Sequence, residues 1–259
     1  MLSLVLSTAT IVLFFMTFVF FIAHVIKDNS VADVAWGLGF VIIALYTLSS
    51  TSTFFPRQIL ITLLVFIWGI RLAVHTLNRS KGRGEDFRYL NLRNKWKKRA
   101  ALKSYVYIYL LQSVLMLVVA FPLIVVNYHY GNLGEDLTYL DNIGIAIWSF
   151  GFVFEALSDF QLTRFKKNSK NKGKLMTGGL WKYSRHPNYF GEVVMWWGIF
   201  IIAVASPKGF YTLISPLLIT NMILFYSGIP LLEKKHKNHI DFQKYAKNTP
   251  IFIPNFFKK

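Results

Sequence analysis

The chain has 259 residues, of which 54% are hydrophobic, and its formal net charge is +17. An ordinary soluble domain is rarely so apolar, so the composition indicates an integral membrane protein. The sequence contains no cysteine. This excludes disulfide bonds and thiolate metal ligands, and we expect no metal site.

The first three predicted elements are hydrophobic segments that can each span a bilayer. Residues 2–26 are long enough to cross a hydrocarbon core of about 30 Å at about 1.5 Å per residue. They lack a basic start and a small-residue cleavage site, so we expect a retained helix and not a signal peptide. Further helices are predicted over residues 31–48 and 56–77. In the second, Gly37 and Gly39 allow close backbone approach.

The rest of the chain predicts four more spans, separated by polar segments. Residues 78–103 are basic and predict a loop with a short surface helix. The remaining spans are predicted over residues 105–128, 140–162, 190–205 and 210–232. The segment between the fourth and fifth spans carries Glu135, Asp136 and Asp141 but no Lys or Arg.

The positions of the charges predict the topology. Of the 29 Lys and Arg residues, 25 lie in segments 78–103 and 164–189 and in the tail from residue 233. These segments follow spans three, five and seven, so they share one side, which the positive-inside rule makes cytoplasmic. We therefore predict an all-α polytopic membrane helix bundle with seven transmembrane helices, the N-terminus outside and the C-terminus cytoplasmic. Residues 1–259 form one transmembrane domain, its basic charge faces membrane lipids, and we expect no nucleic acid partner.

Residues 178–198, GGLWKYSRHPNYFGEVVMWWG, combine a polar loop with the start of an apolar helix. Pro187 suits the first turn of that helix. Unpaired N–H groups and the helix dipole at such a start favour an anion such as phosphate. The polar residues at this helix start are Arg185, His186, Asn188 and Tyr189. Glu192 lies one turn further, where a carboxylate needs a partner. A simpler alternative is a helix start at the membrane surface.

The sequence TGGLWKYSRHPNYFGE of residues 177–192 resembles the C-terminal signature of the steroid 5-alpha-reductase-like membrane reductases, and most closely their bacterial branch. The motif GRGEDFRY of residues 82–89 and the tail pattern that begins at Glu233 resemble that branch too. A similar Arg-His-Pro-x-Tyr element occurs in the isoprenylcysteine carboxyl methyltransferases. The resemblance implies NADPH as the cofactor, bound mainly within about residues 141–259. It also implies a location in a bacterial inner membrane.

The expected cofactor-binding residues come from motif positions and from side-chain chemistry. Motif positions of the resembling reductases are matched by Asn78, Arg79, Asp159, Asn188, Tyr189 and Glu192. Phosphates need cations, and a nicotinamide needs a dry aromatic slot. The further residues expected at the cofactor are Arg83, Arg164, Lys174, Tyr183, Arg185, His186, Trp196 and Glu233. As alternatives, the cations are solvated, the aromatic residues form an interface belt, and Glu155 and Asp159 neutralise Arg164 or Arg185.

The expected catalytic acid has three candidates, Asp33, His75 and Tyr89, which the sequence does not rank. The resembling steroid reductases use a Gln-Glu pair on the second span and a Tyr on the third. Here the second span offers Asp33 and Trp36, and Trp68 stands near the position of that Tyr. The chain departs from the pattern at these positions, so a steroid substrate does not follow from the resemblance.

The sequence therefore predicts an NADPH-dependent reductase that acts on a carbon–carbon double bond conjugated to a carbonyl. Its substrate is lipophilic, either steroid-like or an isoprenoid or other lipid, and enters from the bilayer. An S-adenosylmethionine-dependent methyltransferase of the isoprenylcysteine type is one alternative, and a non-catalytic membrane protein is another. The basic loops favour a phosphate ligand over a cationic sulfonium. The cost of burying carboxylates argues against a protein without a ligand site.

Overall fold

The computed structural model describes residues 1–51, 53–128 and 136–257, and all regular structure in these ranges is helical. Among them are seven helical stretches long and apolar enough to cross a membrane. They cover Leu2–Ile26, Val31–Ser49, Pro56–Ser80, Phe87–Val119, Tyr139–Lys167, Pro187–Val204 and Gly209–His236. The predicted fold class and number of spans are confirmed. The orientation of the termini stays a prediction, and Glu135 lies outside the described residues.

Most helix ends agree with the prediction, and the differences have local causes. The helices that match a single predicted span are α1 (Leu2–Ile26), α2 (Val31–Ser49), α3 (Pro56–Ser80), α8 (Tyr139–Lys167) and α9 (Pro187–Val204). The fourth candidate span starts at Phe87, earlier than predicted, because α4 (Phe87–Trp96) leads by short turns into η2 (Tyr105–Leu110) and α6 (Leu111–Val119). The helix breaks at Ala120, before α7 (Phe121–Asn127). Pro122 lies in the first turn of α7, where its missing N–H costs nothing.

The remaining helices are short and cover the connections and the end of the chain. They are η1 (Lys97–Arg99), α5 (Ala100–Ser104), η3 (Ser169–Asn171), η4 (Gly179–Lys182), η5 (Gly209–Leu213), α10 (Ile214–Asn221), η6 (Met222–Tyr226), α11 (Ile229–His236) and α12 (Ile240–Asn248). The chain folds into two compact units. Unit 1 comprises Met1–Asp141 and Ile202–Ser215, and unit 2 comprises Asn142–Ile201 and Pro216–Lys259. The single domain over residues 1–259 stays a prediction.

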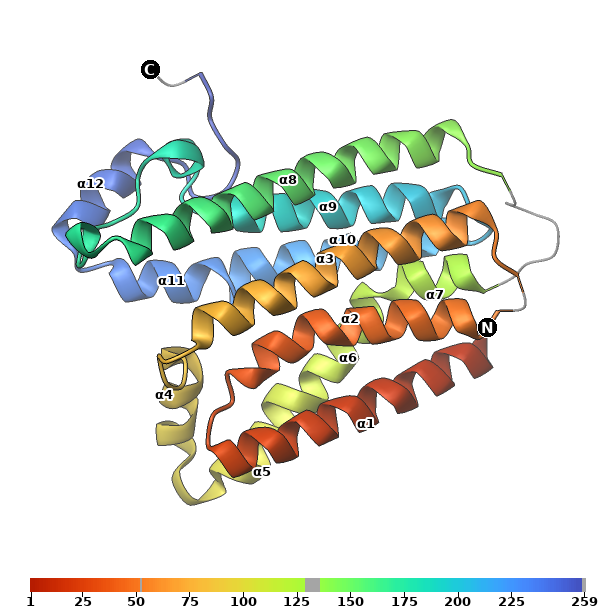
Figure 1. Cartoon of the computed structure of the whole chain (residues 1–259), viewed down its shortest axis with the longest axis horizontal. Helices are drawn as coiled ribbons and strands as arrows, with labels where there is room; N and C mark the ends of the chain where they lie inside the picture. The colour runs from red at the N-terminus through yellow and green to blue at the C-terminus, as the bar shows by residue number, and fades with distance from the viewer. Residues whose placement is uncertain (52, 129–135, 258–259) are drawn as a thin grey trace. The chain divides into compact units, whose positions relative to one another are not determined.

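In unit 1, α2 packs against both α1 and α3 (Figure 1). The contact with α3 is close because two glycines face each other. A Cβ atom on Gly37 would lie 2.6 Å from the carbonyl oxygen of Gly69, and one on Gly69 would lie 2.7 Å from that of Gly37. No side chain fits at either position, so the predicted close approach at Gly37 is confirmed.

A buried ion pair joins the start of α3 to the start of α8 within unit 1. The side chains of Arg57 and Asp141 are 1% and 0% exposed, and Arg57 Nε lies 2.8 Å from Asp141 Oδ1. Arg57 Nη2 donates to Asp141 Oδ2 over 2.8 Å, and the backbone N–H of Thr138 donates to the same oxygen over 2.7 Å. The pair is therefore well supplied with hydrogen bonds, as a buried ion pair must be.

In unit 2, α8 and α9 pack backbone to backbone through glycines seven residues apart. A Cβ atom on Gly191 would lie 2.5 Å from the backbone nitrogen of Glu155, and one on Gly198 would lie 2.6 Å from that of Trp148. On the facing helix, a Cβ atom on Gly151 would lie 2.5 Å from the backbone nitrogen of Met195. This packing holds the start of α9 against the turn of α8 that carries the predicted carboxylates.

Candidate functional site

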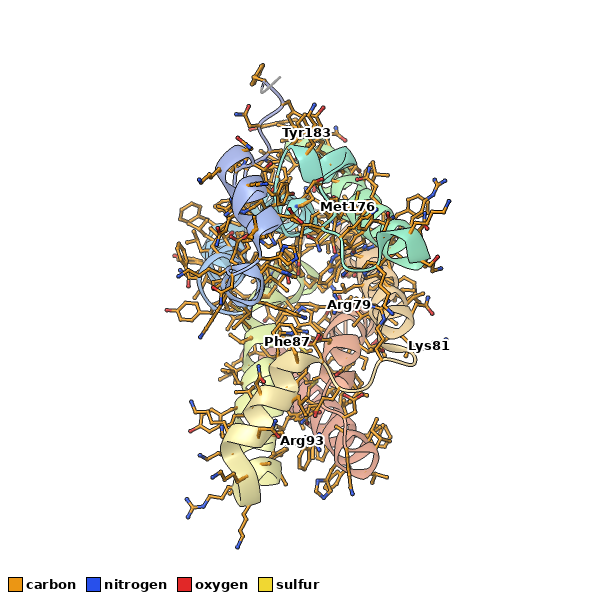
Figure 2. All side chains as sticks on the ribbon, turned by 90° about the vertical axis from the view of Figure 1, so that its left-hand side faces the viewer. Arg79, Lys81, Phe87, Arg93, Met176 and Tyr183 are labelled. Carbon is orange, nitrogen blue, oxygen red and sulfur yellow. The ribbon has the colours of Figure 1, made fainter. Side chains whose placement is uncertain are left out.

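Asp33, on the first turn of α2, is the centre of a polar network in unit 1. Its Oδ1 atom accepts a hydrogen bond of 2.5 Å from the Tyr89 hydroxyl. Its Oδ2 atom pairs with Arg88 and lies 3.7 Å from Arg79 Nη2. The structure thus brings together two predicted acid candidates and one predicted cofactor cation. Figure 2 labels Arg79 beside the start of α4 at Phe87.

Asp86 explains why Arg88 and Tyr89 face Asp33. It is the N-cap of α4, and its Oδ1 atom accepts from the backbone N–H of Arg88 over 3.0 Å and from Arg88 Nε over 2.9 Å. Its own N–H donates to Ser30 Oγ over 2.7 Å. Burial disfavours the charged carboxyl of Asp86, but the hydrogen bonds from Arg88 outweigh it and lower the pKa below its usual value. A charged cap is therefore maintained where α4 begins.

Glu85 links the GRGEDFRY motif of residues 82–89 to the residues before α2. Its Oε1 atom accepts from the backbone N–H of Asn29 over 2.8 Å and from Arg93 Nη2 over 2.8 Å. Gly82 and Gly84 have φ values of 72° and 68°, a left-handed conformation that favours glycine. Arg88 binds Asp86, whereas Arg93 is the partner of Glu85.

The other predicted residues of unit 1 lie at the end of α3 and in the turn that follows. His75 is half-buried, and Asn78 and Arg83 are exposed. Sequence reasoning missed Asn29 and Ser30 as partners of the GRGEDFRY motif. They belong to the polar break between two apolar helices, and nothing in their spacing indicates a contact 56 residues away.

The predicted helix start in unit 2 is confirmed, because α9 begins at Pro187. One residue later, Asn188 Nδ2 donates to Asp159 Oδ1 over 3.2 Å. The side chain of Asp159 is 6% exposed and that of Glu155, one turn earlier on α8, is 2% exposed. Asn188 Oδ1 is buried, and no described residue donates a hydrogen bond to it. An acceptor in this state costs free energy unless a donor reaches it.

Arg185, His186 and Glu233 form a second cluster of unit 2. Arg185 Nε and Nη2 bind the two carboxylate oxygens of Glu233 over 3.0 and 2.9 Å, and His186 Nε2 lies 2.8 Å from Oε1. Arg185 Nη1 donates to the carbonyl oxygens of Ala246 and Thr249. Most donors of the guanidinium are thus used within the protein. The predicted contact of Arg185 with a phosphate stays a prediction.

The C-terminal segment completes the support of the loop before α9. The N–H of Arg185 donates to the carbonyl oxygen of Pro250 over 2.9 Å, and Ser184 Oγ donates to that of Phe252 over 2.7 Å. The Tyr245 hydroxyl donates to the carbonyl oxygens of Trp181 and Ser184. Burial raises the pKa of Tyr245, so its hydroxyl stays protonated and able to donate.

The predicted aromatic residues of unit 2 differ in exposure. Tyr189 is half-buried, and its ring stacks on that of His186 with centroids 5.9 Å apart. Trp196 is fully buried, whereas the half-buried Tyr183 contacts Phe256 with ring centroids 5.0 Å apart. Figure 2 labels Tyr183 and, in the same loop, Met176.

The predicted charged residues of unit 2 differ in exposure too. Glu192 is half-buried on α9. The cations Arg164 and Lys174 are both exposed.

The family profile described as "Protein of unknown function (DUF1295)" matches residues 19–249. The chain belongs to the DUF1295 family. Rat 3-oxo-5-alpha-steroid 4-dehydrogenase 1 is 33% identical over 113 residues, which are 43% of this chain and 40% of the relative. The human protein of the same name is 30% identical over 120 residues, or 44% of this chain and 41% of the relative. These matches confirm the predicted steroid 5-alpha-reductase-like family.

The similarity to these curated relatives is partial. The chain spans about 40% of the length of the dehydrogenases that it matches. A "Probable O-methyltransferase ustE" of Ustilaginoidea virens is 48% identical over 46 residues, which are 18% of this chain and 16% of the relative. No solved structure matches the chain.

In this DUF1295 chain, the two units offer different chemistry. Unit 1 holds a phenol on a carboxylate, Tyr89 on Asp33, and the single phenolic proton would have to turn from Asp33 to act on a ligand oxygen. Unit 2 holds a carboxylate and an open amide acceptor, Asp159 and Asn188, suited to a ligand that donates N–H or O–H groups. Among the described residues, no group of three or more His, Cys, Asp or Glu could hold a metal ion.

Proposed function

We propose that the protein is a multi-pass membrane reductase that uses NADPH to reduce a carbon–carbon double bond conjugated to a carbonyl in a lipophilic molecule. Two of its relatives are named 3-oxo-5-alpha-steroid 4-dehydrogenase 1, the name of an oxidoreductase. The observation that carries the proposal is the buried Oδ1 atom of Asn188, which has no donor among the described residues. The nicotinamide of NADPH bears a carboxamide with two N–H donors, which fits this acceptor.

The start of α9 would hold the nicotinamide end of the cofactor. Asp159 fixes the Asn188 amide from one side, so the open oxygen keeps one direction. Glu192 would accept a hydrogen bond from the carboxamide or from a ribose hydroxyl. The Tyr189 ring would pack against the nicotinamide. Arg164 and Lys174 are exposed, and no described carboxylate forms an ion pair with them, so both can serve phosphates. Arg185, His186 and Glu233 would act mainly by holding the loop in place.

Tyr89 would be the acid of the reaction, with Asp33 as its positioning residue. When bound, NADPH supplies the hydride that adds to the β-carbon of the enone. As negative charge develops on the carbonyl oxygen, the Tyr89 hydroxyl would turn its single proton from Asp33 Oδ1 to that oxygen and transfer it there, which gives an enol. The enol would then become the saturated carbonyl product by taking up a proton from water at the α-carbon and returning its O–H proton to Tyr89. Asp33 also binds Arg88, which helps to hold the carboxylate in position beside the phenol.

Binding measurements on unit 2 variants test the cofactor assignment. Asn188→Ala removes the open acceptor, so NADPH affinity should fall by about 1–3 kcal/mol, the scale for losing a buried hydrogen-bond partner. Asn168→Ala, at an exposed position of the same unit, is the matched control and should bind as the wild type does. Equal affinity of all three proteins would remove Asn188 from the cofactor site.

The short match to a probable O-methyltransferase supports a second candidate, a methyltransferase that uses S-adenosylmethionine. Both cofactors carry N–H and O–H donors, so Asp159 and Asn188 alone do not separate them. The phosphate groups of NADPH distinguish the two cofactors. Exposed cations favour NADPH, whereas the sulfonium of S-adenosylmethionine is itself a cation. The natural substrate would enter from the bilayer, and the bacterial inner membrane is the proposed location.

A further inference from the structure

A basic groove with a volume of about 720 Å³ lies in unit 2 between α11 and α12. Such a volume is in the range of small-molecule sites. Lys234, Lys237 and Lys247 line it, together with Phe242 and Gln243. None of these lysines has a proposed or predicted role in the reductase site described above.

None of the carboxylates that the structure describes is a partner of the three lysines. Among the described residues, no carboxylate lies within ion-pair distance of Lys234, Lys237 or Lys247. Glu233 does line the groove, but Arg185 and His186 occupy its carboxylate oxygens. The groove therefore presents three uncompensated ammonium groups, which attract an anion with several oxygens.

Two of the residues that line the groove, Phe242 and Ala246, are apolar, and the lysine side chains add their aliphatic stems. Phe242 is 8% exposed and packs under Arg185, whose guanidinium carbon lies 6.0 Å from the ring centroid. Ile240, at the start of α12 and two residues before Phe242, is 68% exposed. Gln243 Nε2 donates to the carbonyl oxygen of Lys237 over 3.1 Å and so ties α12 back to the end of α11. A cationic rim on apolar walls fits an amphiphilic anion better than a small hydrophilic one.

The groove begins where a candidate membrane span ends, which would place it near the lipid headgroups. Lys234 belongs to the last turn of α11, and the candidate span Gly209–His236 ends two residues later. Lysines that follow a membrane span lie in the headgroup region, and basic pockets there bind anionic lipid headgroups. A nucleotide would explain the lysines, but neither the exposed Ile240 nor the position at the end of a span.

We propose that the groove between α11 and α12 is a site for an anionic phospholipid. The phosphate of the headgroup binds Lys234, Lys237 and Lys247, and the acyl chains extend toward the bilayer. Its three lysines are distinct from the proposed cofactor residues Asp159, Asn188, Tyr189 and Glu192. It also stands if the protein is not a reductase.

The test is a lipid titration of the full-length protein in detergent, read by native mass spectrometry. The two probes are phosphatidylglycerol and phosphatidylcholine with identical acyl chains. The groove variant is Lys234→Gln, Lys237→Gln, Lys247→Gln. The matched control is Lys167→Gln, Lys170→Gln, Lys172→Gln, which changes the net charge of the same unit equally at exposed positions.

The wild type and the control should prefer phosphatidylglycerol, and the groove variant should lose about tenfold or more of that affinity. Equal losses in both variants would mean diffuse attraction and would overturn the proposal. So would equal binding of the two lipids by the wild type. Glycerol phosphate tests for a soluble ligand, and the proposal fails if it displaces the lipid at equal concentration. Unchanged lipid binding with lost NADPH binding in the groove variant would assign the groove to the nucleotide.

Discussion

Asp33 illustrates how much of the chemistry depends on single contacts. Its carboxylate accepts from the Tyr89 hydroxyl over 2.5 Å and pairs with Arg88, and Arg79 lies 3.7 Å away. The sequence identified Asp33 as one of three unranked acid candidates, but it did not predict the partners of this residue. Of the three acid candidates, Asp33 and Tyr89 form a direct hydrogen bond, and this contact is the basis for assigning the acid to Tyr89.

Tyr89→Phe removes the phenolic proton and little else. If Tyr89 is the acid, NADPH consumption with a lipophilic enone should fall by about 10²–10⁴-fold, the usual contribution of a general acid. NADPH affinity should not change. Tyr107→Phe, at a position 59% exposed on the same candidate span, is the control and should be fully active. An active Tyr89→Phe protein would return the role to His75 or another donor.

Asp141→Asn tests the buried pair with Arg57. Removing one partner leaves an uncompensated charge on Arg57, whose side chain is 1% exposed. We expect a loss of about 3–5 kcal/mol in the free energy of unfolding. The thermal unfolding midpoint in detergent, compared between the variant and the wild type, shows whether stability falls. An unchanged midpoint would mean that the pair contributes nothing to stability.

At the scale of helices, the predicted spans depend on hydropathy and on proline, and these signals are local. They give α1, α2, α3, α8 and α9 to within a few residues at most ends. They do not predict the bend at Ala120 or the early start of the fourth candidate span, because both depend on packing. The glycine contacts between α8 and α9 are tertiary too. Gly191 and Gly198 share a helix face, but their partners appear only in the fold.

Gly191→Ala should disrupt the contact between α8 and α9. The added Cβ atom would lie 2.5 Å from the backbone nitrogen of Glu155, and backbone cannot move away cheaply. We expect a lower unfolding midpoint. We also expect weaker NADPH binding, because Asp159 lies on α8, the helix that the added Cβ atom would displace. Gly178→Ala is the control, since its φ is −99° and a Cβ atom there would meet nothing within 4 Å. Similar midpoints for both variants would contradict the close packing.

The N-cap of α4 should make stability depend on pH. The folded protein lowers the pKa of Asp86 below its usual value of 3.8, so the contribution of its charge is present above that value. It is lost as the pH falls through the lowered pKa. Asp86→Asn keeps a cap acceptor without the charge. The wild type should therefore be more stable than the variant at neutral pH, and the difference should vanish in strong acid. A difference independent of pH would contradict the lowered pKa.

For the whole molecule, the sequence predicts more of the architecture than of the site. Composition and charge predict seven spans because each span satisfies its own backbone hydrogen bonds. The site depends on which polar side chains meet. The sequence placed Asp159 and Asn188 at the cofactor, but it did not show their contact or the engagement of Arg185 by Glu233. Pairings between residues 48 positions apart leave no periodic signal.

The topology is a prediction for the whole chain. Reporter fusions after Lys103 and after the last residue should read as cytoplasmic, because basic segments stay inside. A fusion at Gly131, which lies outside the described residues, should read as external. A cytoplasmic result at Gly131 would contradict the seven-span topology.

The most direct test of the proposed function is a binding titration of the purified wild-type protein with NADPH and, separately, with S-adenosylmethionine. If the protein is a reductase, NADPH binds with saturation below millimolar concentration, and S-adenosylmethionine neither binds nor competes. Binding of S-adenosylmethionine in place of NADPH would contradict the reductase and support a methyltransferase. Binding of neither at millimolar concentration would contradict both enzymes.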